Sequence, residues 1–161
     1  MPVTDLEVVM LRAHISGEDE QAQRAFDQQV MTSGDLSGLA WLVRAAFVIA
    51  AQRKFVAGWN QAGVIRYVGR VRALLSERPG LLDPRVAEDE LASALGGQVP
   101  AAHEVGAMAA ARLFLLDALI ASLDLDDEAI DDLLGEARDS ANRMLTGMTG
   151  QTKTARMTPE M

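Results

Sequence analysis

The chain has no cysteine among its 161 residues. Disulfide-stapled folds, thiolate zinc sites and enzymes with a cysteine nucleophile are therefore excluded. Aromatic residues make up only 4% of the sequence, and no stretch shows the alternation expected of a half-buried strand. Alanine and leucine dominate instead, and both residues lose little entropy on entering a helix. The composition predicts an all-α protein.

No hydrophobic run reaches the ~20 residues that are needed to cross a bilayer. The two most apolar stretches cover 39–51, which contains Arg44, and 105–120, which contains Arg112 and Asp117. The first residues are acidic where a secretory leader would be basic. We therefore expect a cytoplasmic protein with no membrane partner, in which both stretches form buried core helices.

Capping patterns and glycines divide the chain into about six or seven predicted helices. Thr4 and Glu7 fit the T-x-x-E pattern of a capping box, and Asn60 is a suitable N-cap for a later helix. Apolar residues then recur every three or four positions, as expected for helices that bury one face. The sequence predicts a single-domain helical bundle.

The predicted domain covers residues 1–147, with the helices near 35–55 and 100–123 at its centre because both are apolar on more than one side. After Gly147 the chain has no apolar stripe. We therefore expect residues 148–161 to form a disordered C-terminal tail.

Acidic residues are absent between Asp35 and Glu77, although the whole chain has a net charge of −8. The six cations of this stretch give +6, so the rest of the chain carries −14. They are Arg44, Arg53, Lys54, Arg66, Arg70 and Arg72. The overall negative charge disfavours a general nucleic-acid binder, whereas the basic stretch indicates a surface for an anionic partner.

Arg44 is surrounded by apolar residues on the predicted central helix. Burying an unpaired arginine is costly, so its side chain either reaches water, pairs with a carboxylate such as Asp117, or is covered by a partner. A surface that contains Trp41, Phe55 and an arginine has the composition of a protein–protein hot spot.

Arg66 and Arg70 lie one helical turn apart, a spacing at which like charges repel. Either the acidic helices of the chain or an anionic partner can compensate for this repulsion. We predict a non-catalytic interaction module, such as an adaptor, a regulatory subunit or a small homo-oligomer, which binds a protein partner or itself. The predicted partner-binding residues are Trp41, Arg44, Phe55, Arg66 and Arg70.

A DNA-binding regulator is one alternative, because residues 53–72 can form a basic helix-turn-helix with Gly58 in the turn. Lys54 stands where that motif usually has a small residue, and Arg66 and Arg70 come late in the second helix. Nucleic acid is therefore the less favoured partner.

A divalent-metal-dependent enzyme is the other alternative, because residues 124–132 are rich in carboxylates. An EF-hand begun at Asp124 fails, since its sixth position is Ala129 and its twelfth is Gly135. Glu128-x-x-Asp131 resembles one half of the metal motif of all-α nucleotide pyrophosphatases, but no second E-x-x-E precedes it. An acid-rich helix N-terminus explains the cluster without metal.

Known catalytic motifs are also missing. The sequence contains no phosphate-binding glycine loop, no G-x-S-x-G and no H-E-x-x-H, and its two histidines, His14 and His103, stand alone. We therefore predict no catalytic residue, no metal ligand and no cofactor.

Overall fold

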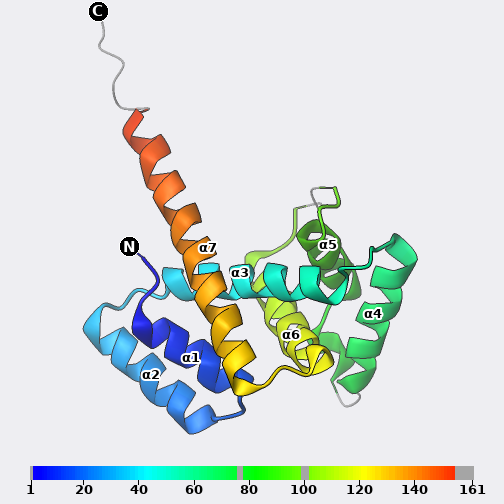
Figure 1. Cartoon of the computed structure of the whole chain (residues 1–161), viewed down its shortest axis with the longest axis horizontal. Helices are drawn as coiled ribbons and strands as arrows, with labels where there is room; N and C mark the ends of the chain where they lie inside the picture. Colours follow the sequence, from blue (N-terminus) through cyan, green and yellow to red (C-terminus); the bar gives the residue numbers. More distant parts are fainter. Residues whose placement is uncertain (1, 76–77, 99–101, 155–161) are drawn as a thin grey trace, which may run out of the picture. The chain divides into compact units, whose positions relative to one another are not determined.

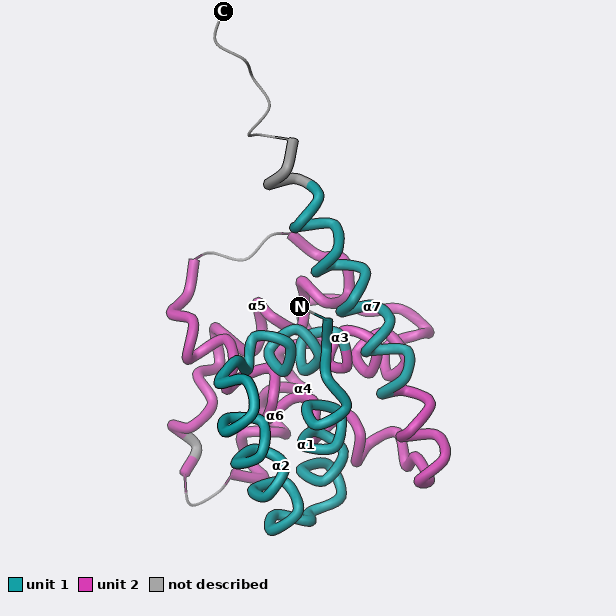
Figure 2. The backbone as a smooth tube through the Cα atoms, turned by 90° about the vertical axis from the view of Figure 1, so that its left-hand side faces the viewer, with its two compact units in different colours: residues 1–45, 134–161 teal, residues 46–133 magenta. Residues whose placement is uncertain are grey.

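The computed structural model describes residues 2–75, 78–98 and 102–154. These ranges hold seven α-helices, one short 3-10 helix and no strand, so the predicted all-α class is confirmed. The helices group into two compact units (Figure 2). Unit 1 consists of residues 1–45 and 134–161, and unit 2 consists of residues 46–133. Helices α3 (Ser37–Lys54) and α7 (Asp127–Thr154), labelled in Figure 1, each contribute to both units coloured in Figure 2.

Unit 1 begins with α1 (Asp5–Ile15) and α2 (Asp19–Thr32), which pack against each other. The predicted capping box is confirmed, since the Glu7 amide donates to the Thr4 hydroxyl at 3.2 Å and the Thr4 amide donates to the Glu7 carboxylate at 2.8 Å. Gly17, with a φ of 72°, reverses the chain between the two helices. Glycine adopts this left-handed conformation without strain.

The Glu7 side chain is only 2% exposed, and Gly38 at the start of α3 lies directly against it. A Cβ atom at position 38 would lie 2.9 Å from both Cδ and Oε1 of Glu7, and closer still to Oε2. A side chain at position 38 would therefore displace the buried carboxylate. Glycine allows the start of α3 to approach the capping box of α1.

Polar contacts also fasten the amino terminus to α7 in unit 1. The Val3 amide donates to Asn142 Oδ1 at 2.8 Å. The Arg138 guanidinium donates to Asp5 Oδ1 at 2.7 Å and to the Val3 carbonyl at 3.1 Å. The Val3 side chain is 1% exposed, so the residue whose backbone makes these hydrogen bonds also belongs to the core.

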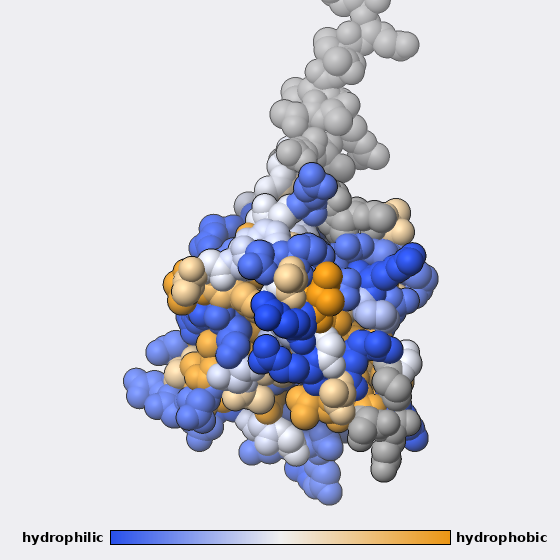
Figure 3. All heavy atoms as spheres, turned by 90° about the vertical axis from the view of Figure 1, so that its right-hand side faces the viewer, coloured by the Kyte–Doolittle hydropathy of each residue, from blue (hydrophilic) through white to orange (hydrophobic). Residues whose placement is uncertain are grey.

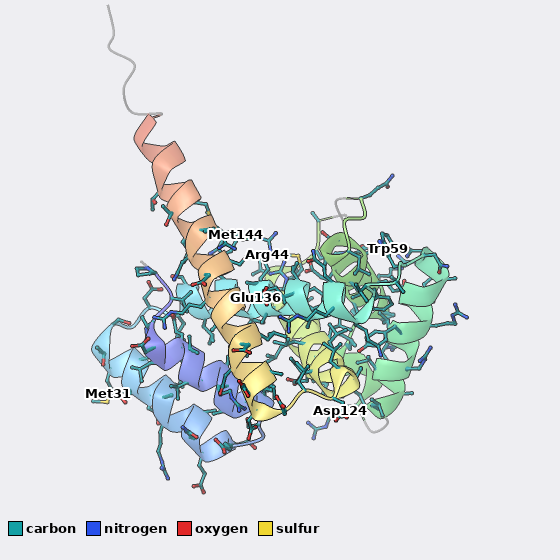
Figure 4. All side chains as sticks on the ribbon, in the orientation of Figure 1. Met31, Arg44, Trp59, Asp124, Glu136 and Met144 are labelled. Carbon is teal, nitrogen blue, oxygen red and sulfur yellow. The ribbon has the colours of Figure 1, made fainter. Side chains whose placement is uncertain are left out.

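Helix α7 does not end near Gly147, where the tail was expected to begin. The helix continues to Thr154, so residues 148–154 are helical, and residues 155–161 lie outside the described part of the chain. Beyond the buried Ala141, Met144 is 39% and Met148 is 54% exposed, whereas Leu145 between them is half-buried. Figure 4 shows Met144 on this last part of the helix.

Unit 2 contains α4 (Gln61–Leu74), α5 (Pro84–Ala94) and α6 (Val105–Leu123), with a 3-10 turn over Pro79–Leu81. Helix α4 packs against α5 and α6, and α5 packs against α6. The Glu90 carboxylate, which is nearly buried, accepts from Arg112 Nε at 2.7 Å and so joins α5 to α6. The cation that interrupts the apolar 105–120 stretch therefore has a partner.

The two helices that were expected at the centre of the domain differ in how far their residues are buried. In α3, Leu42, Ala46, Phe47 and Ala50 are at most 1% exposed. In α6 five residues on one side are buried, whereas Val105 is 75% exposed.

Helix α6 also begins later than predicted. Its N-cap is Glu104, whose carboxylate accepts the amides of Gly106 and Ala107, and Pro100 lies outside the described residues. The helix has 19 residues and a mean hydropathy of 1.7, so by length and composition it can cross a membrane, contrary to the expectation that the stretch is too short. A single such helix is weak evidence of a membrane span, and the Arg112–Glu90 pair within unit 2 is consistent with a soluble protein.

Candidate functional site

A small pocket lies at the turn between α3 and α4 in unit 2. Residues 55–60 form this turn, in which Gly58 has a φ of 117° that a residue with a side chain rarely adopts. Asn60 caps α4 by accepting the Gly63 amide at 2.7 Å. The pocket has a volume of about 290 Å³ and is lined by Phe55, Gly58, Trp59, Asn60, Gly63 and Arg66. Two of the five predicted partner-binding residues, Phe55 and Arg66, thus line one pocket.

The Phe55 ring is held in place by α4. It contacts the Tyr67 ring edge-to-face, with centroids 5.6 Å apart and an interplanar angle of 79°. Tyr67 donates its hydroxyl proton to Ser122 Oγ at 3.2 Å, because the Ser122 hydroxyl itself donates to the Ala118 carbonyl at 2.6 Å. Burial raises the pKa of Tyr67 above its ordinary value of 10.0, although the charge of Arg70 opposes this rise.

Trp59 forms another wall of the pocket, and no periodic pattern pointed to it because it lies outside the helices. Its side chain is 37% exposed and stands at the turn before α4 (Figure 4). A Cβ atom at position 97 would lie 3.0 Å from the indole Cη2 and 2.8 Å from the Ala92 carbonyl. Glycine at position 97 therefore leaves room for the indole against the loop that follows α5.

Basic and apolar side chains are exposed around this pocket. Arg66 and Arg70 are both exposed on α4, and in the described part of the chain no ion pair joins either one to an acidic residue. Val56 and Ile65 are 83% and 47% exposed. Figure 3, viewed from the side where α4 lies in Figure 1, shows orange hydrophobic residues beside dark blue hydrophilic ones. We call Phe55, Val56, Trp59, Arg66 and Arg70 the turn surface.

The remaining two predicted residues form a local group in unit 1. The Arg44 guanidinium lies over the Trp41 ring, 5.3 Å from its centroid, and the Arg44 residue is exposed (Figure 4). Of the three environments considered for Arg44, the structure places it at the protein surface, in a cation–π contact. The five predicted residues therefore make two groups, one in each unit.

Several carboxylates of the proposed metal cluster have structural partners. Asp126 accepts the Ala129 amide at 2.8 Å at the start of α7, and Asp124 ends α6 in a left-handed conformation. Glu104, an acidic residue that precedes this cluster, caps α6. Among the described residues, no group of three acidic or histidine side chains is arranged to hold a metal ion.

The region expected to form a helix-turn-helix does contain two consecutive helices, α3 and α4. Residues 55–60 separate them, which is longer than the three or four residues usual in DNA-binding helix-turn-helix proteins. Arg66 and Arg70 are nevertheless exposed on α4, so DNA binding stays a hypothesis.

The sequence indicated that His103 stands alone, but in the structure it has a partner. Its Nε2 lies 2.7 Å from Asp89 Oδ2 on α5, and the imidazole is 18% exposed. The partner comes from an element 14 residues earlier, so no local spacing could identify it. The pair holds the segment before α6 to α5.

No protein-family model, curated protein or solved structure matches this chain.

Proposed function

We propose that this chain is a non-catalytic, cytoplasmic protein–protein interaction module that docks its partner on the turn surface. The observation that carries the proposal is an exposed indole and an exposed guanidinium, Trp59 and Arg66, which line the same 290 Å³ pocket. Tryptophan and arginine are the residues most enriched among interface hot spots. A pocket rimmed by such residues suits a side chain of a docked protein.

The composition and the shape of the turn surface support a binding role. Phe55 and Trp59 are restrained by Tyr67 and Gly97, so little side-chain entropy would be lost when a partner docks on them. Arg66 and Arg70 are one turn apart, and a carboxylate between them would relieve their mutual repulsion.

The proposal is tested by capturing the tagged protein with its bound partners from a nuclease-treated lysate of its own cells. We expect a stoichiometric protein that is lost when Arg66→Glu and Arg70→Glu are combined and retained with Arg85→Glu, which changes an exposed arginine on α5. Circular dichroism establishes that all variants keep their helices. Recovery of the chain without a partner protein, at the mass of a monomer, contradicts the proposal.

Trp41 and Arg44 provide a second surface to test in the same assay, since they were also predicted to bind a partner. Loss of the partner with Trp41→Ala or Arg44→Glu, together with retention by Arg66→Glu, would move the docking site to unit 1. A change in oligomeric mass instead would identify self-association, measured by light scattering.

Nucleic-acid binding is the second candidate function, because exposed Arg66 and Arg70 follow a helix and a turn. Fluorescence anisotropy with a labelled DNA duplex tests it. Binding that weakens steeply with salt and disappears with Arg66→Glu would support it. Absence of binding at low salt rejects it.

A further inference from the structure

We infer that the turn surface takes a short acidic segment carrying large apolar side chains, with one apolar group in the pocket and a carboxylate on Arg66. This inference rests on the proposed interaction function and names the chemistry of the partner.

The pocket accommodates a side chain and not a folded element. Its volume of about 290 Å³ lies just below the range of sites that enclose whole small ligands, about 300–1,000 Å³. Phe55 is fixed by its edge-to-face contact with Tyr67, and Trp59 is seated against Gly97. Two aromatic side chains in the lining favour an apolar or aromatic group in the pocket.

The charge around the pocket specifies what must flank that apolar group. Arg66 lines the pocket, Arg70 follows one turn later on α4, and Lys54 is exposed at the end of α3. No acidic residue occurs between Asp35 and Glu77, so this part of the sequence supplies no carboxylate of its own. The complementary partner therefore presents carboxylates, which arginine binds through two parallel hydrogen bonds.

The distribution of charge favours a short peptide over a long polyanion. The residues outside the basic stretch carry a net charge of −14, so a nucleic acid extending past the turn surface would meet a negative chain. An acidic peptide needs complementarity only at the pocket and its rim. The same local basic charge thus fits a peptide better than a polyphosphate backbone.

Intrinsic fluorescence can test this inference directly, because the chain has only two tryptophans, Trp41 and Trp59. In a Trp41→Phe background the emission reports on Trp59 alone. The probe is a short synthetic peptide of aspartates and glutamates around a central leucine and phenylalanine. We expect a saturable change in Trp59 emission, weakened by salt, with an affinity reduced about tenfold by Arg66→Glu and unchanged by Arg85→Glu.

Matched peptides show which part of the probe is recognised. One replaces the acidic residues by lysines, and the other replaces leucine and phenylalanine by alanines; both should bind at least about tenfold more weakly than the probe. Equal binding of either peptide, no binding of the probe, or unchanged affinity in Arg66→Glu overturns the inference. Displacement of the probe by a DNA duplex at lower concentration also overturns it.

The peptide assay and the lysate capture fail independently. If the probe does not bind but the captured partner is still lost with Arg66→Glu and Arg70→Glu, the acidic chemistry is wrong and the interaction function stands. If neither assay detects binding, the proposed function fails as well.

Discussion

Replacing Gly38 by alanine is expected to destabilise the chain, although alanine is normally the better helix residue. The new Cβ would lie 2.9 Å from Cδ of Glu7, whose side chain is only 2% exposed. Displacing this carboxylate breaks its bond with the Thr4 amide, which costs about 1 kcal/mol, and the overpacking costs about 1–3 kcal/mol more. After the helix propensity of alanine offsets about 0.5–1 kcal/mol, we expect a net loss of roughly 2 kcal/mol, or about 4–8 °C in Tm for a chain of this size.

Thermal and urea unfolding followed by circular dichroism measure this effect. The matched control is Gly135→Ala in α7, also in unit 1, where a Cβ meets nothing within 4 Å. The control should gain about 0.5–1 kcal/mol from the helix propensity of alanine. In a Glu7→Ala background, Gly38→Ala should become nearly neutral. A Gly38→Ala protein as stable as the Gly135→Ala protein would refute the reasoning.

Three further outcomes follow from the structure. Tyr67→Phe should cost about 1 kcal/mol of stability at neutral pH, because the variant loses the hydroxyl that bonds to Ser122. Because the pKa of Tyr67 is raised in the folded state, the parent chain should lose stability as the pH rises above 10. Urea titrations at high pH should show this loss in the parent chain and not in the variant. Arg112→Met should cost about 3 kcal/mol of stability by leaving the Glu90 carboxylate unpaired, and adding Glu90→Gln should recover part of that stability. In a double-mutant cycle, losses that simply add would show that Arg112 and Glu90 are not coupled. Deleting residues 148–161 should change Tm by less than about 2 °C, since Met148 is 54% exposed; a larger drop in calorimetry would show that this end of α7 packs.

Helix ends were predictable because their signals are local. The Thr4–Glu7 capping box and the Asn60 N-cap each involve atoms three residues apart, and both were found as expected. The start of α6 was predicted wrongly because Pro100 was expected to be its first residue, whereas the Glu104 carboxylate accepts the first amides of the helix. Glutamate is not among the preferred N-cap residues, so capping preferences did not identify Glu104.

The candidate site was predictable only in part. Charge counting located Arg66, and hydrophobic spacing located Phe55, since both belong to continuous patterns along the chain. Trp59 stands in a turn, and its position depends on Gly97, a residue 38 places further along. A glycine that makes room for an indole so far away leaves no periodic signal in a single sequence.

The sequence by itself determined the helical class, the helix caps and the segregation of basic charge, because propensity, capping and formal charge are properties of residues and their near neighbours. Only the tertiary structure decided which apolar residues are covered. Leu115 and Val105 belong to the same apolar helix, yet the first is fully buried and the second is 75% exposed. Burial depends on which helices pack together, and those contacts join residues that are distant in the sequence.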